Sequence, residues 1–248
     1  MKTDWDNVAS WYDAELETNT DSYQAKVIAP NLLRMLTPKK GEVALDLACG
    51  QGYFSRLIAA AGAEVIGIDL SKELIAIAKE KSPTISYSVA SAESTGLKKE
   101  SVDVVVTVLA FENIKKIDET VAEIQRVLKK EGRFILVMLH PAFRIPQYSD
   151  WGFDTKKGLQ YRRVDKYLSE VKVDIERNPH KGGKKVISTT FHRSLQWYMK
   201  IFKKHGFAMT AMEEWISHKK SGAGSRQQAE DAARKEFPMF LALELKKL

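Results

Sequence analysis

The chain has 248 residues, of which 44% are hydrophobic and 29% are charged, proportions that are typical of a soluble globular protein. No run of 18 apolar residues occurs, so no membrane span is expected, and the acidic first residues lack the apolar segment of a secretory signal. The single cysteine cannot form an internal disulfide. We therefore expect a reducing, cytoplasmic location, and no Cys and His spacing indicates a metal site.

The net charge of +7 is unevenly spread. Residues 1–26 hold six acids against two lysines, whereas residues 154–205 hold fourteen Lys and Arg against five Asp and Glu. A basic second half could attract acidic ligands or nucleic acid. The basic residues are scattered and lack interleaved aromatics, so a solvated surface is favoured and nucleic acid remains the alternative partner.

Two helices are predicted ahead of the first strand. Residues 4–17 carry apolar side chains at helical spacing, which predicts a short amphipathic helix. Asp21 or Ser22 could cap a second helix that ends at Leu36.

The stretch from Glu42 to Ser71 organises the chain. Its pattern of apolar runs, small residues and helical spacing predicts four consecutive elements. They are a strand over 43–48, a turn over 49–52, a helix over 53–61 and a strand over 65–68, followed by Asp69. This order is that of the nucleotide-binding half of a doubly wound parallel sheet.

The chemistry of this unit follows from three residues. Gly50 and Gly52 let the backbone approach a ligand closely, and the next helix begins with free N–H groups. Asp69 lies 17 residues beyond Gly52 at the carboxyl end of the neighbouring strand, where a carboxylate can accept hydrogen bonds from a ribose diol. The unit should therefore bind a nucleoside.

The details argue against a dinucleotide. A G-x-G-x-x-G pattern that starts at Gly50 has Ser55 in place of its third glycine. Asp46 would also lie close to a pyrophosphate and repel it, whereas it suits the ammonium of an amino-acid tail. A NAD site, or an α/β domain whose glycines only form a turn, are the weaker alternatives.

The run Asp46-Leu47-Ala48-Cys49-Gly50-Gln51-Gly52 resembles the first motif of class I S-adenosylmethionine-dependent methyltransferases, D/E-x-G-x-G-x-G, in a methyltransferase type 11-like domain. Ala48 replaces the first glycine. The resemblance extends from Val43 to Phe134. It implies an α/β fold with a Rossmann-like seven-stranded mixed sheet, helices on both faces and an antiparallel last strand. The implied cofactor is S-adenosyl-L-methionine, and the product is S-adenosyl-L-homocysteine.

The resemblance also assigns roles around the cofactor. Residues 8–13 resemble the N-terminal segment whose tyrosine closes over the cofactor, although Tyr12 could instead pack on the sheet. Ala92 and Glu93 match a position that contacts the adenine, with a solvated loop acid as the alternative. The expected cofactor-binding residues are Tyr12, Asp46, Ala48, Gly50, Gly52, Asp69, Leu70, Ala92, Glu93 and Leu109.

The remaining core elements follow in order: a helix over 71–81, strands over 85–90 and 102–109, a helix over 117–130 and a strand over 134–139. After the buried strand over 102–109 there is no Asn/Asp-Pro-Pro-Tyr/Phe sequence, which argues against methylation of a base amino group. Leu109 and Phe111 instead indicate an apolar wall near the sulfonium.

His140 follows the strand over 134–139 on the side where open α/β sheets bind ligands. Its ordinary pKa lies near the working pH, so it could act as a general base on the acceptor. It could equally hydrogen-bond the neighbouring backbone.

Residues 141–193 do not fit the core pattern. Alternating runs at 167–175 and 186–191 predict a β-hairpin, and this β-rich insertion after strand 5 is expected to cover the acceptor site. The substrate-pocket candidates are Phe111, Tyr161, Arg163 and His192.

A capped helix over 194–205, a strand over 207–216, a helix to Glu236 and a last strand over 239–245 complete the chain. By resemblance, the last strand inserts antiparallel between the fifth strand and the one before it in sequence. We expect one methyltransferase domain over 1–248, with a lid at 1–40, a cofactor core at 41–140, the insertion at 141–193 and the rest of the core at 194–248.

The expected function is transfer of a methyl group from S-adenosylmethionine to an unidentified small-molecule acceptor, without a metal. The alternatives are a tRNA or rRNA methyltransferase that uses the basic second half, and a non-catalytic S-adenosylmethionine-binding protein. The sequence leaves the oligomeric state open.

Overall fold

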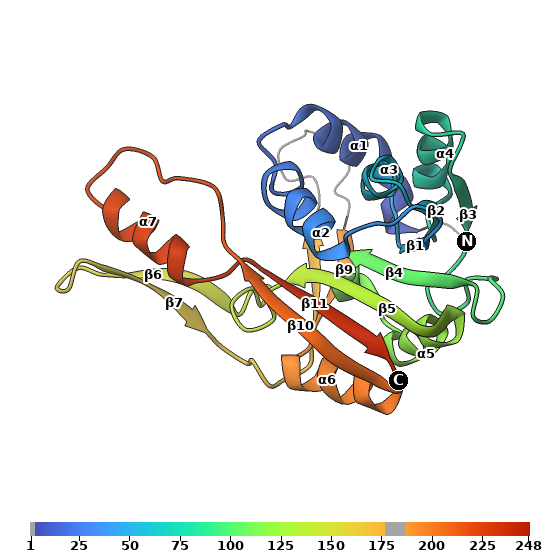
Figure 1. The fold of residues 1–248 in the computed structure, drawn as a ribbon. Coiled ribbons are helices and arrows are strands. Elements are labelled where there is room, and N and C mark those ends of the chain that lie inside the picture. The colour runs from blue at the N-terminus through green and yellow to red at the C-terminus, as the bar shows by residue number, and fades with distance from the viewer. Residues whose placement is uncertain (1–2, 177–186) are drawn as a thin grey trace.

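The computed structural model describes residues 3–176 and 187–248. A seven-stranded sheet with the order β10-β11-β5-β4-β1-β2-β3 forms its centre (Figure 1). Its strands are β1 (Val43–Leu47), β2 (Glu64–Asp69), β3 (Ser86–Val89), β4 (Val102–Val108), β5 (Leu128–Leu139), β10 (Phe207–Trp215) and β11 (Phe240–Lys247). The helices are α1 (Ala9–Thr18), α2 (Ala29–Leu36), α3 (Tyr53–Ala60), α4 (Lys72–Lys81), α5 (Ile117–Val127), α6 (Leu195–Lys204) and α7 (Gln227–Glu236). Three shorter helical segments are η1 (Asp4–Asn7), η2 (Gln24–Ile28) and η3 (Phe111–Asn113).

The strand directions confirm the predicted mixed sheet. The pairs β1–β2, β1–β4, β2–β3 and β4–β5 are parallel. Strand β11 runs antiparallel to both β5 and β10 and lies between them, as predicted. The carboxyl ends of the five parallel strands therefore meet at one edge of the sheet, where open α/β sheets bind ligands.

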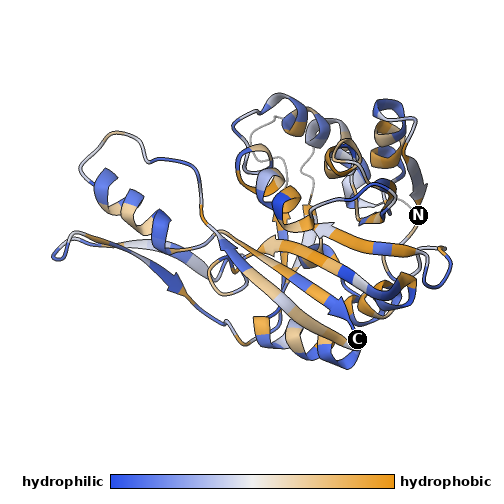
Figure 2. Ribbon diagram, in the orientation of Figure 1, coloured by the Kyte–Doolittle hydropathy of each residue, from blue (hydrophilic) through white to orange (hydrophobic). Residues whose placement is uncertain are grey.

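Helices cover both faces of the sheet because the central strands are apolar on both sides. One core layer combines Leu45 and Leu136 with side chains of α5 and α6, and the other combines Ala44 and Ile135 with side chains of α2 and α3. Figure 2 shows the corresponding hydrophobic colour along the middle of β4, β5 and β11.

Outside the insertion, the elements differ from the predictions at their boundaries. The expected helix over 4–17 is divided into η1 and α1, because Val8 between them has a non-helical backbone with φ −118° and ψ 3°. The second predicted helix is divided into η2 and α2. Helix α5 ends at Val127 rather than at 130, because Leu128 is extended and already belongs to β5.

The insertion contains two antiparallel hairpins instead of the single one expected. The predicted hairpin is formed by β8 (Val171–Glu176) and β9 (Ile187–His192), and its turn lies outside the described residues. A further hairpin, β6 (Ser149–Asp154) with β7 (Leu159–Val164), was not predicted. Its turn has recognisable signals: Asp154 accepts the N–H groups of the next residues, and Gly158 has a φ of 61°.

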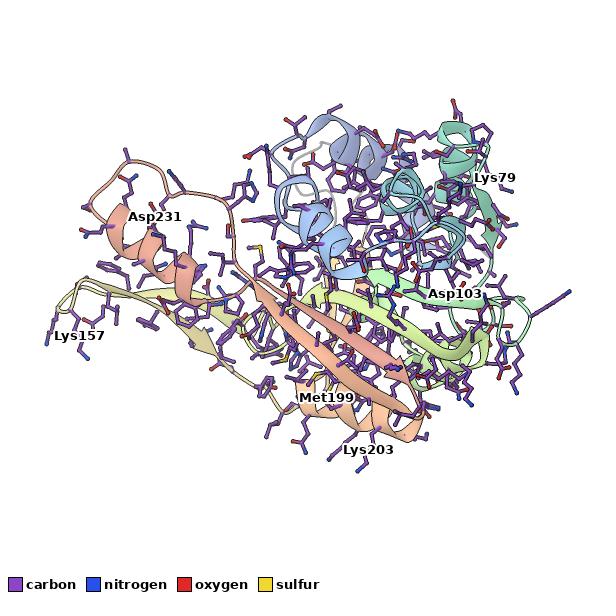
Figure 3. All side chains as sticks on the ribbon, viewed as in Figure 1. Lys79, Asp103, Lys157, Met199, Lys203 and Asp231 are labelled. Atoms are coloured by element: carbon purple, nitrogen blue, oxygen red, sulfur yellow. The ribbon has the colours of Figure 1, made fainter. Side chains whose placement is uncertain are left out.

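The two hairpins lie differently with respect to the edge of the sheet where the insertion is expected to cover the acceptor site. Strand β9 contacts η3 and η1 and so reaches the carboxyl edge of the sheet. The β6–β7 hairpin packs against α7, and together they project from the body of the molecule (Figure 1). In Figure 3, Lys157 marks the tip of this projection and Asp231 lies on α7. Because it points away from the sheet, the β6–β7 hairpin does not roof the site.

Candidate active site

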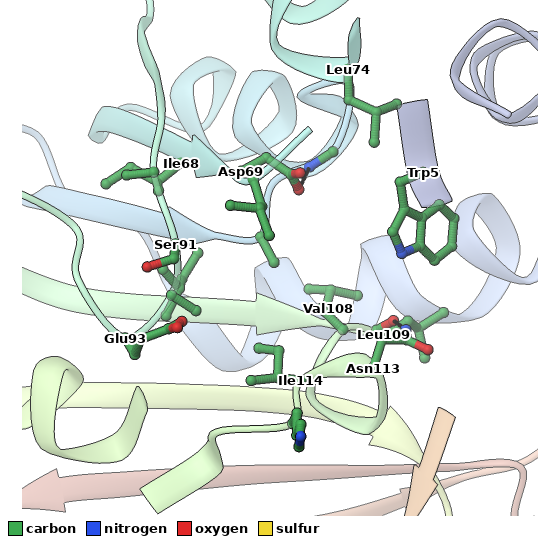
Figure 4. Close-up of a pocket in the computed structure, with 18 of the residues that line it drawn as sticks. Trp5, Ile68, Asp69, Leu74, Ser91, Glu93, Val108, Leu109, Asn113 and Ile114 are labelled. Atoms are coloured by element: carbon green, nitrogen blue, oxygen red, sulfur yellow. Dashed lines mark hydrogen bonds between the residues drawn. The ribbon is translucent and has the colours of Figure 1, made fainter. Parts of the chain in front are cut away.

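A cavity of about 380 Å³ lies at the carboxyl ends of β1, β2 and β4 (Figure 4). We call it the donor cavity. The expected cofactor residues that line it are Tyr12, Ala48, Gly50, Asp69, Leu70, Ala92, Glu93 and Leu109. The other lining residues are Trp5, Leu47, Ile68, Leu74, Ala90, Ser91, Val108, Ala110, Asn113, Ile114, Lys115 and Lys116. The structure thus brings most of the expected cofactor residues to one space.

The turn between β1 and α3 has an unusual backbone. Ala48, Gly50 and Gly52 have φ values of 62°, 57° and 80°, in the left-handed region that glycine adopts without penalty. Ala48 stands where the family motif usually has glycine, and its positive φ strains an alanine backbone. Leu109, on the other side of the donor cavity, has a φ of 52°. Non-glycine residues in this region are uncommon and concentrate at functional sites.

Asp69 connects the carboxyl end of β2 to the glycine turn. Its Oδ2 accepts the N–H of Gly50 at 2.9 Å, and its Oδ1 accepts the N–H of Ser71 at 2.8 Å. Burial raises the pKa of Asp69, while these N–H groups lower it. Each carboxylate oxygen keeps a lone pair beyond these bonds, so the side chain can hold the turn and still accept from two hydroxyls in the cavity.

The opposite end of the donor cavity is formed by Ala92 and Glu93 with the start of α5. Lys116 places its Nζ 3.3 Å from Oε1 of Glu93, so this carboxylate already has a cationic partner. Figure 4 shows Asp69 and Glu93 on separate sides of the same space, with Leu109 and Ile114 nearby. An adenosyl group fits this arrangement because its sugar and its base need polar partners at different ends.

The N-terminal segment covers the donor cavity. Trp5 and Tyr12 both line it, and their rings meet edge to face at 5.5 Å. Asp6 accepts the hydroxyl proton of Ser71 at 2.6 Å, and Lys81 Nζ lies 2.7 Å from Asp13 Oδ1. These contacts fix η1 and α1 against α4, and the lid role expected of this segment stays a prediction.

Asp46 lies behind the glycine turn and does not line the donor cavity. It is only 2% exposed, and its Oδ2 accepts the hydroxyl proton of Ser55 at 2.5 Å. Burial raises the pKa of Asp46 to about 7. In this position Asp46 bonds Ser55, and its direct bond to an amino-acid tail stays a prediction. Gly52 also does not line the cavity, because it faces the hydroxyl of Tyr87.

His140 is enclosed in the protein instead of facing the donor cavity. It is 5% exposed, its Nδ1 accepts the N–H of Ala142 at 3.2 Å, and its Nε2 lies 2.7 Å from Oε1 of Glu214. The Nε2 therefore donates to Glu214, and burial lowers the pKa of His140. This is the backbone-bonded alternative of the sequence analysis, and no ring nitrogen is left to act as a general base.

The four substrate-pocket candidates do not converge on the donor cavity. Phe111 is fully buried against Phe134 in the core, because η3 turns its side chain inward. Tyr161 is 46% exposed on the projecting hairpin, and Arg163 pairs with Asp165 there. His192 is buried and bonds the carbonyl of Tyr167, and it lines a separate, smaller cavity.

Trp5, Asn113, Lys115 and Lys116 line the donor cavity but were not among the sequence candidates. The last three lie in the segment that follows β4, at the edge where ligands bind, and this position was the available signal. Trp5 carried no local signal beyond its helical spacing.

The described residues contain no group of three or more His, Cys, Asp or Glu side chains that could hold a metal ion. Within the same residues, no helix is both long and apolar enough to span a membrane.

Comparisons with known proteins identify the family to which this fold belongs. The family model for the methyltransferase domain matches residues 45–136. The chain is 31% identical over 172 residues to the ubiquinone/menaquinone biosynthesis C-methyltransferase UbiE of Rubrivivax gelatinosus. This alignment covers 67% of this chain and 68% of that protein. It is also 34% identical over 111 residues to the ubiquinone biosynthesis O-methyltransferase of Pelagibacter ubique. That alignment covers 43% of this chain and 46% of the Pelagibacter ubique protein.

Among solved structures, an S-adenosylmethionine-dependent methyltransferase from Mesorhizobium loti superposes with a TM-score of 0.68 at 26% identity. The alignment covers 88% of this chain and 96% of that one. The matched segment contains Ala48, Gly50 and Asp69, which line the donor cavity. The chain therefore belongs to the class I S-adenosylmethionine-dependent methyltransferases, and its cofactor is S-adenosylmethionine.

Proposed function

We propose that this methyltransferase acts on a small-molecule acceptor that approaches the donor between η3 and β9. The observation that carries the proposal is the covered donor cavity. Trp5 and Tyr12 close it from the N-terminal side, and β9 packs on η1 and η3. A covered site suits a small acceptor and the exclusion of water.

The chemistry makes modest demands on the protein. Methyl transfer breaks the bond from sulfur to the methyl carbon, so that the sulfonium becomes a neutral thioether, and forms a bond from the methyl carbon to the acceptor. A neutral oxygen or carbon acceptor then releases a proton to water. Catalysis of the transfer itself rests mainly on alignment and on exclusion of water. Leu109 and Val108 supply an apolar wall, and Asp69 and the glycine turn fix the donor. His140 takes no part in this proposal because both of its ring nitrogens are bonded within the protein.

The relatives support a small acceptor without fixing the methylated atom. The Rubrivivax gelatinosus protein is named as a C-methyltransferase and the Pelagibacter ubique protein as an O-methyltransferase, both of quinone biosynthesis. Carbon and oxygen acceptors thus occur among proteins at similar identity to this chain. An acceptor with an aromatic or quinone ring is the class that these names support.

RNA as an acceptor is less well supported. Several lysines of the body are held in ion pairs, including Lys129 with Asp103 at 2.9 Å and Lys204 with Asp118 at 2.6 Å. Binding of RNA depends on lysine and arginine contacts that release counterions. A gel-shift series with bulk tRNA at increasing salt tests this point: we expect no salt-dependent complex, and a complex that weakens steeply with salt would favour the RNA reaction.

Turnover is tested with a fractionated cell extract. The purified chain is incubated with S-adenosylmethionine and either the low-mass fraction or the RNA fraction, and formation of S-adenosylhomocysteine is measured. We expect product with the low-mass fraction. Product with the RNA fraction alone would contradict the proposal, and donor binding without product in either fraction would favour the non-catalytic alternative.

A further inference from the structure

A second, smaller cavity lies next to the donor cavity, and we call it the arginine cavity. Its volume is about 30 Å³, and it lies where β5 ends, beside β9 and η3. Its lining residues are Glu112, Met138, Leu139, Pro141, Arg144, Pro146, Thr190, Phe191, His192, Arg193 and Tyr198.

Arg144 is a half-buried cation of this wall with no carboxylate partner among the described residues. Its Nε is buried and makes no hydrogen bond, and its guanidinium lies over the ring of Trp151 at 5.7 Å. Arg162 lies over the same ring at 5.1 Å. Burial and the charge of Arg162 lower the pKa of Arg144 to about 10, which still leaves it positively charged at pH 7.

Arg193 is the second cation of the wall, and it is 5% exposed. Its Nη2 donates to the carbonyls of Ile114 at 3.1 Å and Lys115 at 3.0 Å, in the segment that also lines the donor cavity. Its Nη1 is buried and has no hydrogen-bond partner. Arg193 therefore ties the wall of the donor cavity to the arginine cavity and retains an unused donor.

The charges of the arginine cavity do not balance. Among the described residues, Glu112 is the one carboxylate that lines it, against the two arginines Arg144 and Arg193. Burial lowers the pKa of His192, so this residue adds no charge at neutral pH. The arginines thus outnumber the carboxylate. A buried donor without a partner, such as Nε of Arg144 or Nη1 of Arg193, is destabilising unless a ligand satisfies it.

The size and geometry of the arginine cavity indicate which ligand group could bond its unpaired donors. About 30 Å³ is room for about two water-sized atoms, which corresponds to the two oxygens of a carboxylate. Arginine presents planar N–H groups that match a carboxylate. The cavity is too small for a whole acceptor, so the rest of such a molecule would lie outside it.

The position of the cavity indicates which molecule supplies that group. The donor cavity lies at the end of β4 and the arginine cavity at the end of β5, which are adjacent strands. The two share η3, since Asn113 lines the first and Glu112 lines the second. We propose that the methyl acceptor carries a carboxylate that binds in the arginine cavity to Arg144 and Arg193, an inference that rests on the proposed function.

The test uses the full chain saturated with S-adenosylhomocysteine and two ring probes of similar shape. Calorimetric titration with benzoate, which is charged, is compared with benzamide, which is neutral. We expect benzoate to bind and benzamide not to bind. Arg144→Gln should weaken benzoate binding by about tenfold or more, because charge-assisted hydrogen bonds are lost. Arg226→Gln is the control, since Arg226 also lies over a ring, Phe153, but is exposed.

A second measurement separates a binding role of Arg144 from a structural one. In urea unfolding without benzoate, Arg144→Gln should be at least as stable as the wild type, because it removes a half-buried charge and a buried Nε donor that makes no hydrogen bond. Benzoate should raise the unfolding midpoint of the wild type but not that of the variant. A variant that is less stable without benzoate and gains as much from benzoate as the wild type would overturn the proposal.

The outcomes distinguish this inference from the proposed function. We expect S-adenosylhomocysteine to bind equally to the wild type and to Arg144→Gln. Equal binding would show that Arg144 does not bind the carboxylate of the donor. Weaker S-adenosylhomocysteine binding in the variant would assign the cavity to the donor and contradict the inference. Equal binding of benzoate and benzamide would remove the inference alone, whereas no methyl transfer to any low-mass acceptor would remove the proposed function.

Discussion

Gly52 occupies a position in the glycine turn where no side chain fits. Its φ is 80°, and a Cβ atom there would lie 2.5 Å from the hydroxyl oxygen of Tyr87. Gly50 has a φ of 57°, but its Cβ would meet only a carbon of Tyr12 at 3.7 Å. The two glycines therefore differ: one is required for backbone conformation alone, and the other for conformation and space.

Gly52→Ala should lower the free energy of unfolding by about 2 kcal/mol or more, because left-handed strain adds to the steric overlap. Gly50→Ala should cost about 1 kcal/mol, from the strain alone. Tyr87→Phe removes a buried hydroxyl that has no hydrogen-bond partner among the described residues, and it should reduce the cost of Gly52→Ala. Urea unfolding of the single and double variants measures these differences, and an undiminished cost in the double variant would contradict the overlap.

The buried carboxyl of Asp46 makes stability depend on pH. Burial raises its pKa from 3.8 to about 7, so between about pH 4 and pH 7 the folded state binds a proton that the unfolded state releases. Stability therefore falls as the pH rises through this window, by up to about 1.4 kcal/mol per pH unit.

Asp46→Asn keeps an acceptor for Ser55 and removes the titration. In the absence of donor, the stability advantage of the wild type over Asp46→Asn should be larger at pH 5 than at pH 7.5. Denaturant unfolding at both values measures it. An advantage that is constant, or larger at pH 7.5, would show that Asp46 is ionised in the folded protein.

Asp69 holds the glycine turn and faces the donor cavity at the same time. Asp69→Ala should cost on the order of 1.5–3 kcal/mol of donor affinity, because bonds to the ribose hydroxyls are lost. Asp103→Ala is the matched control, since Asp103 bonds Val43 and Lys129 at the amino ends of the strands. Calorimetry with S-adenosylhomocysteine compares them, and unchanged affinity in Asp69→Ala would refute the placement of the sugar.

The glycine positions and Asp69 could be predicted from sequence because turn backbone and strand ends leave local signals. The direction of Asp46 could have been read from strand alternation, since it shares a face of β1 with Ala44, which packs in the layer covered by α3. The burial of His140 and Phe111 could not be predicted from the sequence, because their partners, Glu214 and Phe134, are distant in sequence.

At the scale of elements, the N-terminal segment formed by η1 and α1 is held by polar contacts and presents aromatic rings to the donor cavity. Helix α1 is tied to α3 by the ion pair of Arg56 with Glu17, and to α4 by Lys81 with Asp13. Trp5 and Trp11 are both half-buried, but only Trp5 lines the cavity.

Trp5→Ala should weaken S-adenosylhomocysteine binding by about 1–2 kcal/mol, because the donor then loses apolar contact with the indole. Trp11→Ala should leave the affinity unchanged. Fluorescence or calorimetric titration provides both values. Equal losses of affinity in the two variants would indicate that both indoles stabilise the N-terminal segment generally and that Trp5 has no specific contact with the donor.

The insertion shows how far sequence patterns describe elements. Alternation predicted the β8–β9 hairpin, and its pairing runs from Val171 opposite His192 to Glu176 opposite Ile187. The β6–β7 hairpin was missed although its turn residues were present. Its distance from the donor cavity could not be foreseen, because α7, which lies far later in the chain, packs against it.

At the scale of the whole molecule, the sheet order follows from chain physics. Parallel strands need crossover helices, and right-handed crossovers place β1, β2 and β4 side by side with the glycine turn at one edge. The final insertion of β11 between β5 and β10 confirms the resemblance. The same edge carries both cavities, since each lies beyond the carboxyl ends of adjacent strands.

The most direct test of the whole account is a pair of calorimetric titrations of the full chain, one with S-adenosylhomocysteine and one with NAD. We predict saturable binding of S-adenosylhomocysteine and no binding of NAD, because the cavity has Asp69 for a ribose and lacks a third glycine for a pyrophosphate. Tight binding of NAD with no response to S-adenosylhomocysteine would contradict the account.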